Sequence, residues 1–229
     1  MQQKMLDPRL SLACDLYDPC GLAADIGTDH AHLPAALLQR GRCQHMILTD
    51  ISESALENAR TEMIRLRLTD RVSLRLGDGL SPVSEKCGMI SVMGMGGRTI
   101  RSILLSGKNR LQGASLLLSA HTDWHLIRSA LQDIGYRPDR EEPCFAAGRF
   151  YLILRARPGA VPMTGREIRL GGPLFFSGSP VLLPFLRRRR DVLQARLNGL
   201  LSASVPDAAE IRVLREDLDF LNAFLSSRS

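Results

Sequence analysis

The chain has 229 residues, of which 45% are hydrophobic and 24% are charged. This length allows one full α/β domain and a smaller part, with the composition of an ordinary globular protein. No segment approaches the roughly 20 consecutive apolar residues of a membrane span. Residues 1–8 also lack the apolar core of a signal peptide, so we expect a cytoplasmic protein without membrane contact.

The positive charge is concentrated in the second half of the chain. The formal net charge is +6, yet residues 1–97 carry 10 basic and 12 acidic side chains. Only three of the 30 basic residues are lysine. Because arginine suits phosphate contacts and base stacking, this pattern favours a nucleic-acid partner. An arginine-rich genome composition is the alternative explanation.

The cysteines and histidines do not form a metal-binding pattern. The five cysteines are scattered and include no Cys-x-x-Cys pair, which is typical of free thiols in a reducing compartment. His121 and His125 have the spacing of one helix face, but no His-Glu-x-x-His motif surrounds them. We therefore predict no metal site.

Short apolar runs alternate with amphipathic helical stretches along most of the chain. In chain order, the predicted elements are a helix over 6–17, a strand over 22–26, a helix over 34–40, a strand over 46–49, a helix from Ser52, strands over 72–76 and 89–93, a helix through Ile100 to Leu104, a strand over 115–118, a helix over 124–134, and strands over 137–143 and 150–157. This alternation predicts an α/β fold whose open, mostly parallel sheet has helices on both faces.

The pattern changes after residue 157. Residues 158–180 are rich in proline and glycine and predict a linker that wraps around the first domain. Residues 181–229 then carry leucines at near-heptad spacing on both sides of a break, which predicts an α-helical coiled-coil hairpin. The predicted division is thus a domain over 1–157, a linker over 158–180 and a hairpin over 181–229.

Acidic residues follow the first three predicted strands. Asp25, Asp50 and Asp78 lie at strand ends, where ligands of open parallel sheets bind. A dinucleotide would need Gly-x-Gly-x-x-Gly at the first of these ends, and the chain lacks it. S-adenosylmethionine has no phosphate and carries a sulfonium and an ammonium, so an acidic cradle suits it. We expect Asp50 to bind the ribose hydroxyls and Asp78 to face the adenine amine. Each residue alone could equally be a helix cap or a turn residue.

Three segments carry a resemblance to a known family. They are Asp-Ile-Gly-Thr-Asp-His-Ala-His-Leu-Pro at 25–34, Leu-Gly-Asp-Gly-Leu at 76–80 and Gly-Met-Gly-Gly at 94–97. These segments resemble the signature of the bacterial TrmK family, class I methyltransferases that modify N1 of adenine 22 in tRNA. The family has a Rossmann-like domain followed by a small coiled-coil domain, so the likeness covers the whole chain. It implies S-adenosylmethionine as cofactor and tRNA as partner.

The resemblance also implies site residues. Asp25, Gly27, Asp50, Asp78 and Gly79 would hold the cofactor. The complete predicted cofactor-binding set adds their neighbours Thr28, Ile51, Met93 and Gly94.

The predicted substrate-binding residues are Gly96, Gly97, His121, Arg187 and Arg188. Where the family commonly has Gln-Pro-Asn, residues 119–121 read Ser-Ala-His, which bears on the choice of target nucleotide. Within the arginine run 187–190, we expect contact with tRNA phosphates, although the run also fits a solvated helix face.

Adenine N1 has a free lone pair, so methyl transfer to it requires no prior deprotonation. The enzyme must unstack the base, align N1 with the methyl group and exclude water. We predict Asp29 as the carboxylate that stabilises the cationic product, and His30 as a proton acceptor or positioning group. A histidine that hydrogen-bonds its own loop is the alternative for His30. His121, Trp124 or Tyr151 would stack on the base, unless Trp124 is a core residue.

Two other functions remain open at this point. One is a methyltransferase that acts on a small molecule or a protein, and the other is a non-catalytic Rossmann-like module that binds RNA. We expect a monomer or a weak homodimer associated through the hairpin.

Overall fold

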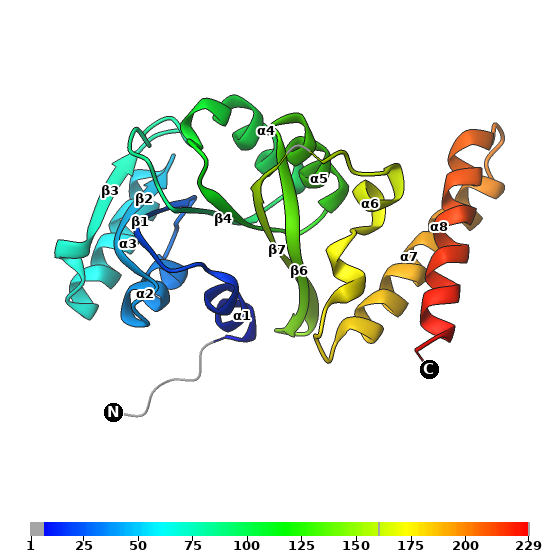
Figure 1. Cartoon of the computed structure of the whole chain (residues 1–229), viewed down its shortest axis with the longest axis horizontal. Helices are drawn as coiled ribbons and strands as arrows, with labels where there is room; N and C mark the ends of the chain where they lie inside the picture. The colour runs from blue at the N-terminus through cyan, green and yellow to red at the C-terminus, as the bar shows by residue number, and fades with distance from the viewer. Residues whose placement is uncertain (1–6, 160, 229) are drawn as a thin grey trace. The chain divides into compact units, whose positions relative to one another are not determined.

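The computed structural model describes residues 7–159 and 161–228 (Figure 1). They form two compact units, which divide between Ser177 and Gly178. The first unit contains a seven-stranded sheet in the order β3-β2-β1-β4-β5-β7-β6. Its strands are β1 (Cys20–Ile26), β2 (Cys43–Asp50), β3 (Val72–Leu76), β4 (Met89–Met95), β5 (Ser115–Ala120), β6 (Tyr136–Ala146) and β7 (Arg149–Pro158).

Strands β1 to β5 are parallel, and β7 is antiparallel to both β5 and β6. The carboxyl ends of β1 to β5 therefore meet at one edge of the sheet. The strand order reverses between β1 and β4, and ligands of open α/β sheets bind at such a reversal. The topology thus places the candidate site at the ends of β1, β2 and β4.

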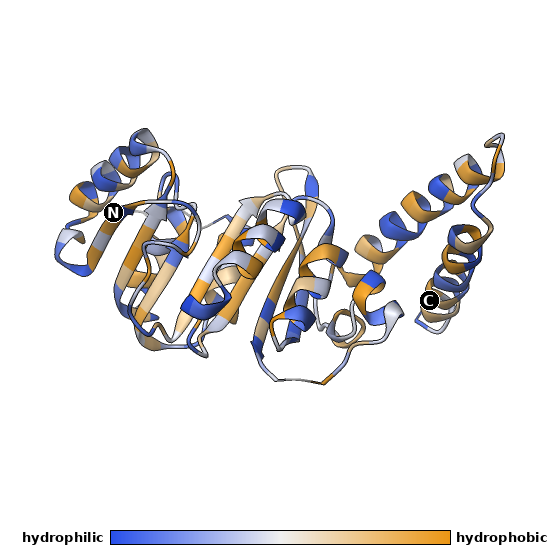
Figure 2. Ribbon diagram, turned by 90° about the horizontal axis from the view of Figure 1, so that it is seen from above, coloured by the Kyte–Doolittle hydropathy of each residue, from blue (hydrophilic) through white to orange (hydrophobic). Residues whose placement is uncertain are grey.

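Helices cover both faces of the sheet. The helices on the two faces are α1 (Pro8–Leu16), α2 (His32–Gln39), α3 (Glu53–Leu66), α4 (Gly97–Ser106) and α5 (Trp124–Asp133). Two 3₁₀ turns, η1 (Thr69–Arg71) and η2 (Lys108–Arg110), accompany them. Alternate strand residues point to opposite faces: Ala24 and Ile26 pack with α4 and α5, whereas Ala23 packs with α1, α2 and α3. Figure 2 shows the apolar character of the strands between these helices. The predicted α/β fold is confirmed.

The predicted opening helix is shorter than expected. Helix α1 begins at Pro8, because the Asp7 carboxylate accepts a hydrogen bond from the Arg9 N–H at 2.8 Å and proline suits the first turn. Leu6, where the predicted helix begins, lies outside the described residues.

The segment expected as a linker contains two short helices, α6 (Gly165–Leu170) and η3 (Pro173–Phe176). Beside it, Arg128 and Glu141 form a fully buried ion pair at 2.7 Å. The Arg128 guanidinium also donates to the Ile168 carbonyl at 3.2 Å. These interactions join α6 to α5 and β6, and sequence periodicity gives no sign of them.

The second unit, from Gly178, consists of helices α7 (Leu182–Leu201) and α8 (Ala208–Ser226). The two helices pack through the apolar side chains of Leu197, Ile211, Leu214 and Leu218. An ion pair between Arg196 and Glu210 joins them near their connection. The structure therefore shows a helical hairpin, and its coiled-coil character stays a prediction. Among the described residues, no helix is both long and apolar enough to cross a bilayer.

Candidate active site

The loop after β1 is tied to the end of β2. The backbone N–H groups of Gly27 and Thr28 donate to the Thr49 carbonyl at 2.8 and 3.0 Å. Gly27 has a φ of +74°, and a Cβ there would lie 1.9 Å from the Met95 side chain. The positive φ favours glycine at this turn, whereas the end of the flexible Met95 side chain could shift to make space for a Cβ.

Asp25 is a buried carboxylate at the end of β1, with 6% of its surface exposed. It accepts a hydrogen bond from the Ser91 hydroxyl at 2.5 Å. Burial raises the pKa of Asp25 to about 6. A carboxylate in such a position costs free energy unless a ligand supplies positive charge or hydrogen-bond donors.

Asp29 and Asp50 lie side by side. The Asp29 N–H faces the Asp50 carboxylate at 3.4 Å, and the other Asp50 oxygen accepts from the Ser52 N–H at 3.0 Å. Asp50 therefore orders the loop as well as the start of α3. Asp29 has a left-handed φ of 44°, which is strained for a residue other than glycine and is common at functional sites. Ile51, next to Asp50, has 73% of its surface exposed.

The end of β3 joins the same edge. The Gly77 N–H donates to the Asp50 carbonyl at 3.0 Å, and the Thr49 hydroxyl donates to the Gly79 carbonyl at 3.3 Å. Gly79 has a φ of +53°, and Asp78 before it is exposed. The structure thus brings together the three strand ends that the sequence predicts.

His30 lies at the surface of the β1 loop. Its Nε2 is 3.7 Å from the Asp29 carboxylate, and its ring stacks on His32 with centroids 5.6 Å apart. Both Asp29 and His30 are more than half exposed. The pair is therefore accessible to a large substrate.

A cavity of about 150 Å³ opens beside this loop. It is lined by Arg9, Leu10, Asp25, Gly27, Thr28, Asp29, His30, His32, Leu33, Met93 and Gly94. Seven of these residues were predicted as site residues. The sequence does not indicate Arg9 and Leu10, because α1 carries no motif, and it predicts no role for His32 and Leu33, although they lie within the segment 25–34.

The remaining predicted substrate residues occupy different places. The His121 N–H donates to the Met95 carbonyl at 3.0 Å, so His121 lies at the end of β5, next to the Gly96 turn after β4. Gly97 is buried, and a Cβ there would lie 2.5 Å from the Asp123 carbonyl oxygen, which makes it a packing residue at the start of α4. Arg187 and Arg188 are exposed on α7, in the second unit.

Tyr151 and Trp124, the other two candidates for base stacking, are less accessible to a substrate base than His121 is. Tyr151 has only 6% of its surface exposed. Trp124 packs against the core, and its indole N–H donates to the Ala120 carbonyl at 3.0 Å. Of the three, His121 alone is exposed.

The donor set indicates the kind of ligand that fits. Asp25 and Asp50 supply carboxylate oxygens for hydroxyl or cationic groups, and Gly94 leaves open space where a Cβ would stand. The buried Thr28 hydroxyl oxygen lies near Asp25 without a hydrogen bond of normal geometry. Within the described residues, no group of three or more His, Cys, Asp or Glu side chains is placed to hold a metal ion.

Comparisons with known proteins agree with this geometry. A family model described as a methyltransferase domain matches residues 6–154. The chain is 27% identical over 195 residues to the tRNA (adenine(22)-N(1))-methyltransferase of Bacillus subtilis (strain 168), covering 84% of this chain and 79% of the relative.

Solved structures are similar over nearly the whole chain. The crystal structure of Streptococcus pneumoniae Sp1610, a putative tRNA (m1A22) methyltransferase, has a TM-score of 0.84 at 27% identity and covers 96% of this chain and 100% of its own. Its complex with S-adenosyl-L-methionine has a TM-score of 0.82 at the same identity and the same coverage. The predicted resemblance to the TrmK family is confirmed. The chain belongs to the methyltransferase-domain family.

Proposed function

We propose that this protein is an S-adenosylmethionine-dependent methyltransferase that methylates N1 of adenine 22 in tRNA. The observation that carries the proposal is the acidic edge formed by Asp25, Asp29 and Asp50, in a chain that resembles tRNA (adenine(22)-N(1))-methyltransferases along most of its length. The structure of a relative with S-adenosyl-L-methionine bound supports the same cofactor here.

The cofactor would be held by residues from four strand ends. Asp50 would accept hydrogen bonds from the ribose hydroxyls, and the exposed Ile51 side chain would cover one face of the adenine. Asp78 and Gly79 would line the other side of the ring. The buried Asp25 would face the methionine part, together with the loop at Gly27 and Thr28 and the backbone at Met93 and Gly94.

Bound S-adenosylmethionine supplies an electrophilic methyl group on a cationic sulfur. The adenine N1 lone pair forms the new N–C bond as the S–C bond breaks, so the positive charge moves from sulfur to the base. Asp29 would stabilise this charge, because its carboxylate lies on the exposed side of the cavity where a base would enter. His30, next to it, would position the base or accept a proton from the product.

The proposal extends to substrate contacts. Gly96 and His121 lie at the ends of β4 and β5, beside the expected path of the base, and Gly97 would set the position of the loop at Asp123. Arg187 and Arg188 would contact tRNA phosphates. We also propose that the enzyme is cytoplasmic and uses no metal ion. We further propose that it is a monomer or a weak homodimer, and sedimentation equilibrium tests this oligomeric state.

Transfer of a labelled methyl group tests the proposed function. The protein is incubated with methyl-labelled S-adenosylmethionine and unmodified tRNA, and nucleosides from the digested RNA are separated by mass spectrometry. We expect label in 1-methyladenosine. Label confined to protein or to small molecules would instead support a different methyltransferase, and failure of the cofactor to bind in calorimetry would support a non-catalytic module.

A further inference from the structure

The tip of the β6–β7 hairpin, residues 145–150, lies at the same edge of the sheet as the candidate active site. Strand β7 is antiparallel to β5, so it begins where β5 ends. The Ser119 hydroxyl of β5 donates to the Leu152 carbonyl of β7 at 3.0 Å, and His121 follows two residues later. The hairpin tip therefore borders the place where a substrate base would enter.

Tyr151 connects this hairpin to the cofactor cavity. Arg9, which lines the cavity, places its guanidinium carbon 5.0 Å from the centre of the Tyr151 ring. Arg149 lies at the same distance from the ring, and its Nε donates to the Tyr151 hydroxyl at 2.5 Å. Two arginines thus gather on one tyrosine next to the site.

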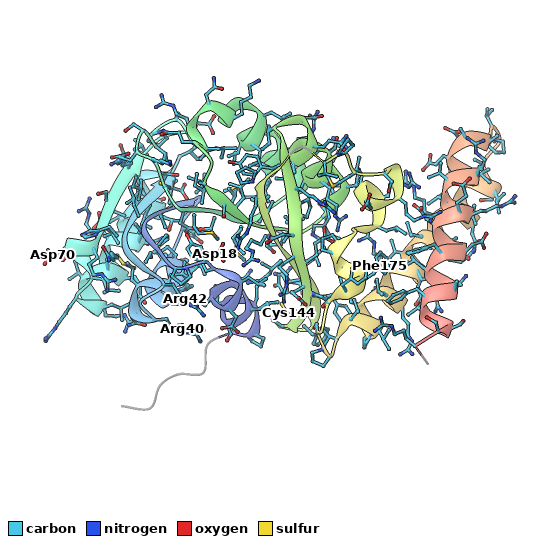
Figure 3. The ribbon with its side chains drawn as sticks, viewed as in Figure 1. Asp18, Arg40, Arg42, Asp70, Cys144 and Phe175 are labelled. Atoms are coloured by element: carbon cyan, nitrogen blue, oxygen red, sulfur yellow. The ribbon has the colours of Figure 1, made fainter. Side chains whose placement is uncertain are left out.

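The hairpin tip is anchored to α1. Tyr151, Cys144 and Ala146 form a small apolar cluster with Leu12 of α1. Figure 3 labels Cys144 on β6 where this strand runs beside α1. The turn that follows uses left-handed residues, Ala147 at a φ of 47° and Gly148 at 76°. A tip held in this way offers a fixed surface rather than a loose loop.

An aromatic side chain stands exposed on this surface. Phe145 has 47% of its surface exposed and meets the edge of Phe150 at a centroid distance of 4.9 Å and an interplanar angle of 64°. The neighbouring Arg149 is also exposed. An exposed ring next to arginine is the combination that binds unpaired nucleotides, because rings stack on bases and guanidinium groups contact phosphates.

We propose that Phe145 and Arg149 form a docking surface for a nucleotide that flanks the target base in the RNA substrate and is unpaired in the complex. Phe145 stacks on one flanking base. Arg149 has five N–H donors, of which Nε is held by Tyr151, and the donors on its two terminal nitrogens contact a phosphate of the RNA. This inference rests on the proposed function and adds a recognition surface that the sequence did not indicate.

Four variants of the full-length protein test the surface: Phe145→Ala, Phe145→Trp, Arg149→Ala and, as a matched control, Phe176→Ala. Phe176 is 88% exposed and lines a different cavity with Arg137 and Pro158, at the opposite ends of β6 and β7. For each variant, the dissociation constant for unmodified tRNA is measured by fluorescence anisotropy over a range of salt concentrations. Calorimetry gives the affinity for S-adenosylmethionine.

We expect Phe145→Ala to weaken tRNA binding roughly tenfold, which corresponds to about 1.4 kcal/mol. Phe145→Trp keeps a stacking ring and should bind within roughly twofold of the unaltered protein. Arg149→Ala should make the negative slope of log affinity against log salt less steep by about 0.7. Cofactor affinity should stay unchanged in all four variants, and Phe176→Ala should bind tRNA normally.

The outcomes separate this inference from the proposed function. If the unaltered protein binds and methylates tRNA but Phe145→Ala binds it as tightly as Phe176→Ala does, the docking surface is wrong and the function stands. If Phe145→Ala and Phe145→Trp weaken binding equally, stacking is excluded. If the unaltered protein binds no tRNA, both proposals are overturned.

Discussion

At the scale of single residues, the buried carboxylate of Asp25 is the clearest sign of a binding site. Burial raises the pKa of this group from 3.8 to about 6. Between these values the folded protein holds a proton that the unfolded chain has released, so the free energy of unfolding falls as pH rises through this window. The ligand-free protein is therefore less stable at neutral pH than it would be without this charge.

The substitution Asp25→Asn should separate stability from binding. We expect it to raise the unfolding free energy of the ligand-free protein at pH 7.5 by roughly 1–3 kcal/mol, because it removes a buried charge. It should also weaken S-adenosylmethionine binding at least roughly tenfold, since a cationic ligand loses its counter-charge. Thermal unfolding and calorimetry measure the two effects. The exposed Asp70→Asn serves as control, and loss of stability in Asp25→Asn would contradict this account.

Asp29 and His30 should differ in their effect on turnover. Removing the Asp29 charge with Asp29→Asn should lower kcat roughly 10–100-fold with little change in cofactor affinity, because the carboxylate acts on charge that develops during the transfer. His30→Ala should lower kcat less than Asp29→Asn does, because His30 positions the base or accepts a proton only from the product. Single-turnover kinetics with saturating tRNA measure both, and a normal kcat in Asp29→Asn would remove Asp29 from the mechanism.

Part of this candidate site could be predicted from the sequence, because its acidic residues mark the ends of parallel strands. Asp25, Asp50 and Asp78 follow apolar runs, and the ends of parallel strands converge whatever the helices between them. Arg9 and Ser91 were missed because one lies on a helix without a motif and the other in the middle of a buried strand. Their proximity to Asp25 depends on tertiary packing, which periodicity does not describe.

At the scale of elements, the segment between β7 and α7 is the main difference between prediction and structure. The strands were predictable because apolar alternation and turn residues mark them locally. The segment 158–180 is rich in proline and glycine and has no apolar periodicity, yet α6 and η3 form there, and α6 is held by Arg128, which pairs with the buried Glu141 and donates to the Ile168 carbonyl. Gly171 allows the close approach, since a Cβ at this position would lie 2.1 Å from a Glu141 oxygen. This residue has a φ of +96°, which also requires glycine.

The substitution Glu141→Ala should release this segment. It leaves the Arg128 charge buried without its partner, which typically costs about 3–5 kcal/mol of stability. We expect a lower Tm and faster proteolysis within residues 158–177. The pair of Arg65 and Glu62 provides the control, because Arg65 is exposed and Arg65→Ala should leave the stability nearly unchanged. Equal effects of the two substitutions would show that the buried pair does not hold the segment.

At the scale of the whole molecule, the question is what the helical hairpin contributes. The positive charge predicted to bind RNA includes Arg187 and Arg188, both exposed on α7. Four consecutive arginines point around a helix, so the run as a whole cannot contact one RNA strand. These two residues, rather than the complete run, carry the proposal.

Reversing both charges, with Arg187→Glu and Arg188→Glu, should weaken tRNA binding and flatten its dependence on salt. Each lost phosphate contact makes the negative slope of log affinity against log salt less steep by about 0.7–0.9. Filter binding at several salt concentrations measures this, and cofactor affinity should not change. The same reversal at Arg60 and Arg65 on α3 controls for net charge, and identical binding curves for the two double variants would rule out a specific role for α7.

The position of the methyl group tests the central claim most directly. Two tRNA transcripts that differ only at nucleotide 22, adenine in one and guanine in the other, are incubated with the protein and labelled S-adenosylmethionine. They are then digested and mapped by mass spectrometry. We predict one methyl group on N1 of adenine 22 in the first transcript and none in the second. Equal methylation of both transcripts, or of neither, would contradict the assignment.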